Sequence, residues 1–166
     1  MASVATSHAV RRRVMRRRAA ALACVAWALA TSALAEVAST NGWMRPTHAG
    51  DASADAYVDL QADGEETLIG VTTPIAQTVE LVAGGVENGE YRTRVVGSFA
   101  LAAHAKLRFA RYGNVLRLRG ITHAAIVGDS VRIELVLRDD HGRRHTANAD
   151  IVVRGLSLPA RKELPR

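Results

Sequence analysis

Apolar and polar residues alternate along two segments in the C-terminal part of the chain, residues 131–138 and residues 148–154. A period of two sends every second side chain to the same face, so each segment is predicted to be a β-strand with one buried face. Residues 139–144 between them are polar and contain Gly142. This composition is typical of a hairpin connection, so the two strands are expected to be antiparallel neighbours.

Shorter segments of the same kind lie upstream. The candidate strands are residues 56–60, 67–73, 78–83, 91–96, 106–109 and 115–119, and turns are predicted at residues 62–64, 84–85, 87–89, 112–114 and 128–130. The Ala-rich stretch 99–105 is compatible with a helical turn, and the tail 155–166 contains two prolines. Eight short strands separated by turn residues predict an all-β domain, an antiparallel sandwich or barrel of about eight strands.

The N-terminal segment follows a different pattern. Six arginines between residues 11 and 18 precede an apolar run over residues 19–30, and small residues occupy 33 and 35. These are the three parts of a secretory signal peptide, with cleavage predicted after Ala35 and export to a bacterial periplasm. The apolar run is shorter than the ~20 residues of a membrane-spanning helix, so no transmembrane anchor is expected after cleavage. A lipid anchor on Cys24 is disfavoured because only five apolar residues precede it.

Removal of the leader changes the charge and the available chemistry. The chain has 22 basic and 16 acidic residues, and the leader contains six of the basic ones and no acidic one, so residues 36–166 are neutral overall. Nucleic acid is therefore not an expected partner. Cys24 is the only cysteine. The exported protein is expected to have no disulfide and no thiolate ligand or nucleophile.

An ordered series of local sequences carries a resemblance to a known family. The series is Trp-Met-Arg-Pro at 43–46, residues 54–60, residues 67–76, residues 79–82, Phe-Ala-Leu at 99–101, Gly113, Gly-Ile at 120–121 and Gly-Asp-Ser-Val at 128–131. In this order, across residues 43–154, it resembles the periplasmic copper chaperones of the PCu(A)C family. The resemblance implies a cupredoxin-like β-sandwich, Cu(I) as cargo, and a periplasmic or membrane copper-handling partner such as an assembling cytochrome oxidase.

The same resemblance implies four copper ligands, two histidines and two methionines, but this chain has other residues at those positions. The histidine positions correspond to Val82 and Val115, and the methionine positions to Thr93 and Arg117. Thioethers and imidazoles suit Cu(I), whereas valine has no donor atom and threonine is a hard, weak ligand. A guanidinium ~4 Å from Cu(I) repels it by about 4 kcal/mol at an effective dielectric of about 20. We expect weak or no copper binding at the family position.

Five histidines remain after cleavage and define the alternative of a relocated metal site. They are His48, His104, His123, His141 and His145. Imidazole suits copper and zinc, and His141 and His145 flank one predicted hairpin tip. The simpler interpretation is that all five are solvent-facing loop residues, because their surroundings are rich in turn residues.

Residues 115–119 also predict a surface. Arg117 and Arg119 are expected on one side of their strand, opposite Leu116 and Leu118. Two guanidiniums on one face could bind a carboxylate or phosphate of a partner, or form an ordinary solvated strand face. Arg92 and Arg94 would extend this surface if they shared its side.

The sequence contains no catalytic motif of the nucleophile, zinc-hydrolase or phosphate-loop kind, so we do not expect an enzyme. The predicted function is that of an exported PCu(A)C-like protein in copper handling or oxidase assembly, with a degenerate metal site. The alternative is a periplasmic protein-binding or structural module that has no connection with copper.

Overall fold

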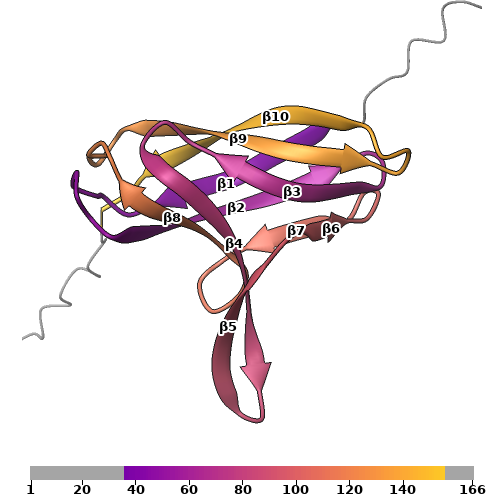
Figure 1. Ribbon diagram of the computed structural model, residues 1–166, viewed down its shortest axis with the longest axis horizontal. Coiled ribbons are helices and arrows are strands. Elements are labelled where there is room, and N and C mark those ends of the chain that lie inside the picture. Colours follow the sequence, from indigo (N-terminus) through magenta and orange to yellow (C-terminus); the bar gives the residue numbers. More distant parts are fainter. Residues whose placement is uncertain (1–35, 156–166) are drawn as a thin grey trace, which may run out of the picture. The chain divides into compact units, whose positions relative to one another are not determined.

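The structure, a computed structural model, describes residues 36–155 and contains ten β-strands in this part of the chain (Figure 1). The strands are β1 (Val37–Met44), β2 (Ser53–Ala62), β3 (Glu66–Thr72), β4 (Ala76–Glu87), β5 (Glu90–Val96), β6 (Phe99–Leu101), β7 (Lys106–Phe109), β8 (Val115–Ile121), β9 (Ser130–Asp139) and β10 (Arg144–Val153). All eight predicted strands are present. The structure adds β1 and β6.

The strands form one sheet in the order β5-β4-β8-β2-β1-β10-β9-β3-β6, with β7 paired to β2. The sheet folds over itself, so that β3, β9 and β10 lie across a shared core from β2, β4 and β8 (Figure 1). Leu60 of β2 and Leu118 of β8 pack in one apolar cluster with Leu68 of β3 and Leu135 of β9. The predicted all-β sandwich is confirmed. Alternation explains it, because each strand sends every second side chain into the space between the layers.

Strand β1 joins the two layers and departs from the antiparallel prediction. It pairs with β2 in antiparallel and with β10 in parallel orientation. Its register to β2 shifts between Thr40 and Trp43, and Asn41 between them has a φ of 55°. Such a bulge interrupts the alternation of side chains. The strand therefore lacks the period-two signal that identified the others.

The outer half of β4 and all of β5 form a hairpin that projects from the sandwich; we call this hairpin, residues 83–97, the arm (Figure 1). Its tip is a two-residue turn at Asn88 and Gly89, with φ values of 54° and 82°. Positive φ at both positions is the requirement of a type I′ hairpin turn. The turn predicted at residues 87–89 is therefore confirmed.

One sequence-based prediction of local structure is wrong, and another possibility is met only in part. The Gly84–Gly85 pair was predicted as a turn but lies within β4. A Cβ atom on Gly84 would collide with the carbonyl of Gly113 and the hydroxyl of Tyr91, so this glycine serves a close approach between segments. Residues 99–105 were compatible with a helical turn, and residues 102–105 form a turn closed by the hydrogen bond from Ala105 N to Ala102 O at 3.0 Å. Residues 99–101 are instead strand β6, which pairs with β3. A partner distant in the sequence overrides the helix propensity of alanine there.

The predicted leader, the cleavage point after Ala35, Cys24 and nearly all of the predicted tail lie outside the described residues. Within residues 36–155, no helix has the length and apolar character needed to cross a membrane.

Candidate functional site

The four positions at which the family resemblance implies copper ligands lie on one face of the sheet. Val82 of β4 is paired with Val115 of β8, and Arg117 is paired with Glu80 two residues along the same strands. Strand β5 pairs with the other edge of β4, and there Thr93 is the partner of Gly84. Residues paired across strands share a face, and so do residues two apart on one strand. The sheet therefore gathers these four positions, although they come from three strands.

Valines that are paired across β4 and β8 occupy the two positions at which the resemblance implies histidines. Val82 and Val115 are 1% and 4% exposed, yet neither belongs to the main core cluster between the layers. Their neighbours Leu81 and Leu116 point to the opposite side and do belong to that core. The face thus buries two valines where the resemblance implies imidazoles, and they offer no atom that binds a metal.

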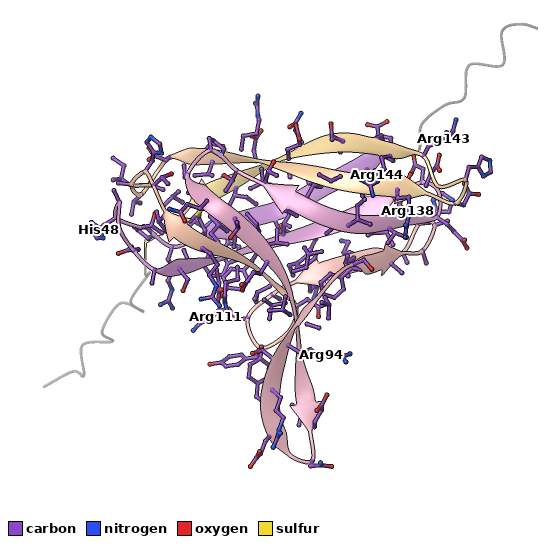
Figure 2. The ribbon with its side chains drawn as sticks, viewed as in Figure 1. His48, Arg94, Arg111, Arg138, Arg143 and Arg144 are labelled. Atoms are coloured by element: carbon purple, nitrogen blue, oxygen red, sulfur yellow. The ribbon has the colours of Figure 1, made fainter. Side chains whose placement is uncertain are left out.

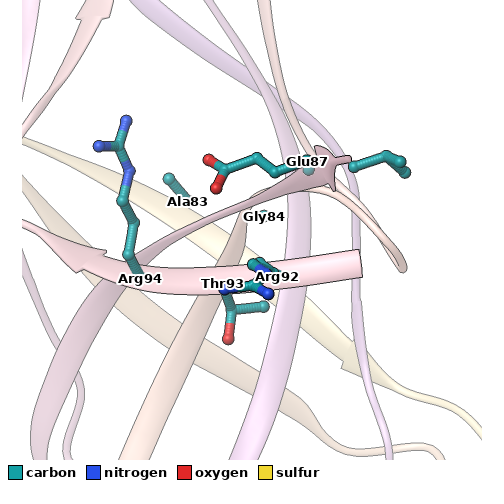
Figure 3. Close-up of a pocket in the computed structure, with 8 residues that line it drawn as sticks. Ala83, Gly84, Glu87, Arg92, Thr93 and Arg94 are labelled. Carbon is teal, nitrogen blue, oxygen red and sulfur yellow. The ribbon is translucent and has the colours of Figure 1, made fainter. Parts of the chain in front are cut away.

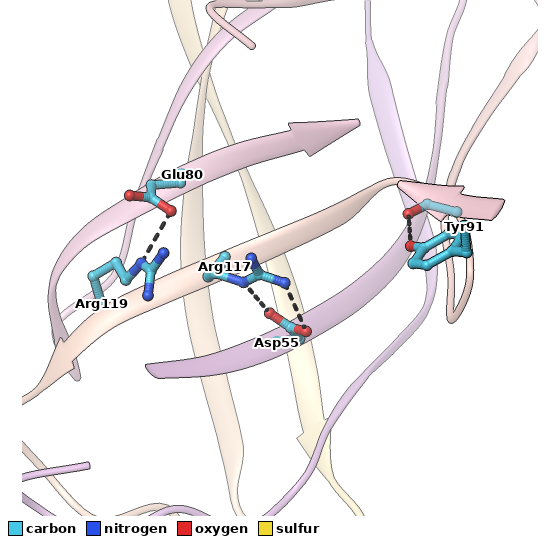
Figure 4. A network of polar contacts seen from close by, with 6 residues as sticks. Asp55, Glu80, Tyr91, Arg117 and Arg119 are labelled. Atoms are coloured by element: carbon cyan, nitrogen blue, oxygen red, sulfur yellow. Dashed lines mark hydrogen bonds and ion pairs between the residues drawn. The ribbon is translucent and has the colours of Figure 1, made fainter. Parts of the chain in front are cut away.

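The second methionine position is occupied by a cation that is paired with a carboxylate (Figure 4). Arg117 donates from Nε to Oδ1 of Asp55 at 2.9 Å and from Nη2 to Oδ2 at 3.4 Å. This hydrogen bond raises the pKa of Arg117. Next to it, Arg119 Nε donates to Glu80 Oε2 at 3.0 Å. The arginines predicted to bind a partner therefore share the expected face, and each already has a carboxylate from a neighbouring strand.

The other two arginines considered for this surface point away from it. Arg92 and Arg94 are paired with Gly85 and Ala83, so they alternate with Thr93 and occupy the opposite face of the arm. Figure 3 shows Arg94 and Thr93 on opposite sides of β5, beside a shallow pocket of about 380 Å³ formed by the arm. Arg92 and Arg94 consequently do not extend the surface of Arg117.

A loop from β7 to β8 closes over the base of the arm. The Tyr91 hydroxyl donates to the carbonyl of Gly113 at 3.2 Å (Figure 4). The Tyr91 ring also meets that of Tyr112 edge to face, with 5.9 Å between centroids. Gly84 has no side chain at the point where this carbonyl approaches. These contacts fix the arm relative to β8, next to Val82 and Val115.

The structure does not assemble the histidines into a metal site. His48, His104, His123 and His141 are exposed, and each lies in a different loop or turn. His123 contacts Thr122, and His141 lies 3.0 Å from Asp140. Among residues 36–155 there is no group of three or more His, Cys, Asp or Glu side chains arranged to hold a metal ion.

His145 differs from the other histidines because it points inward from β10. Its Nε2 lies 3.6 Å from Oε1 of Glu66, with side-chain exposures of 10% and 0%, and neither side chain has a hydrogen-bond partner among the described residues. Burial raises the pKa of Glu66, and the nearby His145 opposes that effect. Sequence reasoning missed Glu66. Alternation was the available signal. Glu66 is two residues before Leu68 and His145 is four before Ala149, so each shares the inward-facing side of its strand with a core residue.

The sequence and the fold are both similar to those of known proteins. A family model described as "Putative lipoprotein LpqE-like" matches residues 37–151. No curated protein sequence matches the chain. Among solved structures, the copper-bound PCuAC domain from PmoF2 aligns with a TM-score of 0.55 and 20% identity, over 75% of this chain and 97% of that domain.

Two metal-free domains agree with this match. The apo PCuAC domain from PmoF2 aligns with a TM-score of 0.55 and 20% identity, over 76% of this chain and 95% of the domain. The apo PCuAC domain from PmoF1 gives 0.53 and 18% identity, over 70% and 93%. At these identities the matches establish the fold, and the predicted PCu(A)C resemblance is confirmed. The chain therefore belongs to the LpqE-like family and has the fold of PCuAC domains.

Proposed function

We propose that this protein is an exported, non-enzymatic accessory protein of copper handling that works through protein contacts and does not hold Cu(I) at the family position. One observation carries the proposal: the sheet face where the resemblance implies four ligands presents Val82, Thr93, Val115 and Arg117. Three of these have no soft donor atom, and the fourth is a cation paired with Asp55. The fold shared with PCuAC domains, one of them described as copper-bound, supports the biological context.

The partner-binding surface in this proposal is the outer face of β8 and its neighbours, which includes Arg117 and Arg119. Their side chains are 26% and 45% exposed, so guanidinium N–H groups are available beyond the bonds to Asp55 and Glu80. A guanidinium has five N–H donors, and one carboxylate does not satisfy them all. An acceptor on a partner protein can therefore add to these pairs without breaking them.

Metal binding is tested by competition for Cu(I) against a coloured chelator, with Cu(II) and Zn(II) titrated in parallel. We expect no removal of Cu(I) from the chelator. Tight, stoichiometric uptake would contradict the proposal. Substitution of His48, His104, His123, His141 and His145 one at a time would then identify a relocated site.

The protein contact is tested by cross-linking in cells, followed by identification of the captured proteins. Arg119→Gln is expected to reduce recovery of the partner, with Arg132→Gln as the matched control. Arg132 also pairs with an acidic residue, Asp150, but it lies on β9 in the other layer. Equal recovery with both variants would rule out the face of β8 that presents Arg117 and Arg119 as the partner-binding surface. Capture of proteins without any copper or oxidase role would favour the alternative, a binding module unrelated to copper.

Export is part of the proposal and is tested by the mass of the protein recovered from cells. Cleavage after Ala35 predicts a chain that begins at Glu36. The family description names a lipoprotein, so lipidation of Cys24 is the competing form, and its added acyl mass distinguishes it.

A further inference from the structure

A pocket lies beside the proposed partner surface, and both acidic and basic side chains line it. It has a volume of about 330 Å³ and lies where the loop after β1, strand β2 and the β7–β8 loop meet. The polar residues that line it and matter here are Arg45, Thr47, Asp51, Asp55, Tyr57 and Arg111. Three separate segments thus direct polar side chains toward one space.

The two arginines of this pocket, unlike Arg117 and Arg119, have no acidic partner. Within residues 36–155 neither Arg45 nor Arg111 takes part in an ion pair. Asp55 is neutralised by Arg117, and Asp51 accepts a hydrogen bond from the backbone amide of His48 at 2.8 Å. Asp51 also lies 3.9 Å from His48 Nδ1, so both carboxylates of the pocket have partners of their own. The two guanidiniums do not, and an anion is the complementary ligand.

Hydroxyl groups add neutral donors to these cations. Burial and the carboxylate of Asp55 raise the pKa of Tyr57, while Arg111 and Arg45 oppose that effect, so the phenol keeps its proton at neutral pH. The Tyr57 hydroxyl makes no hydrogen bond among the described residues. Thr47, also in the wall, is 4% exposed and its hydroxyl has no partner there.

The segments that hold the arginines are fixed by backbone hydrogen bonds. Thr47 and Ala125 exchange two such bonds of 3.0 and 3.1 Å, which anchor the loop that contains Arg45. The β7–β8 loop is held by the bond from Ala110 N to Asn114 O at 2.8 Å, and the Arg111 guanidinium lies 5.8 Å from the centre of the Tyr112 ring. These bonds fix the backbone from which the two arginine side chains project, so the loops themselves lose little conformational entropy when a ligand binds.

We propose that this pocket binds a carboxylate group, with Arg45 and Arg111 as the cationic anchors and the Tyr57 hydroxyl as a neutral donor. A carboxylate accepts paired N–H bonds from a guanidinium in a planar, bidentate arrangement. The group belongs either to a small dicarboxylic acid or to an acidic side chain of a partner protein. Carboxylate binding in this pocket requires neither copper nor a partner bound to Arg117 and Arg119.

The test uses the fluorescence of Trp43, whose ring packs against that of Tyr57 with 4.5 Å between centroids and a tilt of 34°. Trp27 and Trp43 are the two tryptophans of the chain, so the full chain with Trp27→Phe reports on the pocket alone. We expect a saturable change on titration with succinate at low ionic strength. The double variant Arg45→Gln/Arg111→Gln should weaken binding by at least about tenfold.

Two further variants control for folding and for general charge. Arg94→Gln removes another exposed arginine, one that does not line this pocket, and should leave the succinate affinity within about twofold. Asp51→Asn removes the opposing carboxylate and should tighten binding several-fold, a gain that damaged folding would not produce. Equal melting temperatures confirm that the variants are folded.

A hexaglutamate peptide distinguishes the two sources, with hexaglutamine as the uncharged control. Saturable binding of hexaglutamate but not hexaglutamine supports an acidic partner segment, and binding of succinate alone supports a small dicarboxylate. The proposal is overturned if neither succinate nor hexaglutamate gives a saturable response. It is also overturned if the double variant binds as well as the unchanged protein.

Discussion

Arg117 on β8 and Asp55 on β2 are 62 residues apart in the sequence and form a two-bond ion pair on the sheet face where the family resemblance implies a copper ligand. Their side chains are 26% and 33% exposed, so solvent screens the pair only partly. The pair fills the position with two opposite charges that neutralise each other. This arrangement explains how an arginine can occupy the position of a metal ligand without destabilising the sheet.

The stability contributed by this ion pair is measurable with a double-mutant cycle. We expect Asp55→Asn and Arg117→Met each to lower the free energy of unfolding, and the coupling energy between them to be about 1 kcal/mol. Urea denaturation of the four proteins gives this value. The exposed pair of Arg132 and Asp150 is the control, with an expected coupling near zero. Equal coupling in both cycles would contradict a special role for the pair.

Rebuilding the implied ligands tests whether the four positions are correctly assigned. The variant Val82→His/Thr93→Met/Val115→His/Arg117→Met should bind Cu(I) and compete with a chelator, because it places two imidazoles and two thioethers on one sheet face. The version that keeps Arg117 should bind at least about tenfold more weakly, because it lacks one thioether and retains a cation. If the four-residue variant fails to bind although it is folded, the assignment of these positions is wrong.

The two glycines of β4 predict opposite outcomes of the same substitution. Gly84→Ala places a methyl group against the Gly113 carbonyl and the Tyr91 hydroxyl, so we expect the loop to shift, their hydrogen bond to break, and the free energy of unfolding to fall by about 2 kcal/mol. Gly85→Ala meets nothing within 4 Å. It should be neutral or slightly stabilising. Thermal unfolding of both variants measures the difference, and similar melting temperatures would disprove the close approach.

The buried Glu66 predicts a pH-dependent effect on stability. Burial raises the pKa of Glu66 above its ordinary 4.5, with His145 and Arg143 opposing the shift and Asp139 and Asp140 adding to it. A carboxyl whose pKa is higher in the folded state stabilises the fold while it is protonated. This contribution is fully present below about pH 4.5 and is lost as the pH rises through the folded-state pKa.

Glu66→Gln removes this titration while keeping the shape of the side chain. Relative to the unchanged protein, the variant should gain unfolding free energy as the pH rises from about 4.5 through the raised folded-state pKa of Glu66. Denaturant titrations at a series of pH values provide the measurement. Glu65→Gln, at the exposed neighbouring position, should show no such trend. A gain for Glu66→Gln that is constant with pH would show that Glu66 does not titrate differently in the folded state.

Alternation of apolar and polar residues was enough to find most of the sheet. Strands β9 and β10 have one apolar face along their length, so residues adjacent in the sequence already contain the information. Strand β1 lacked this signal because its bulge near Asn41 interrupts the period. Strand β6 is only three residues long, and its pairing with β3 depends on residues more than thirty positions away.

The candidate site was less predictable than the fold. The resemblance placed four positions on this chain, and their residue types alone argued against Cu(I). The alternation in residues 115–119 also placed Arg117 and Arg119 on one side, as the structure has them. Their carboxylate partners were not predicted, because Asp55 and Glu80 come from two other strands whose order in the sheet no local pattern specifies.

The sequence by itself determined eight of the ten strands in residues 36–155, the buried side of the strands with clear alternation, and the absence of soft metal ligands at the four family positions. These depend on residue type and on spacings of a few residues. Only the tertiary structure decided which charges meet: Arg117 with Asp55, Glu66 with His145, and Arg45 and Arg111 around Tyr57. Strand order and register set these encounters. They result from the packing of the whole sheet, in which contacts between distant segments decide the neighbours of each side chain.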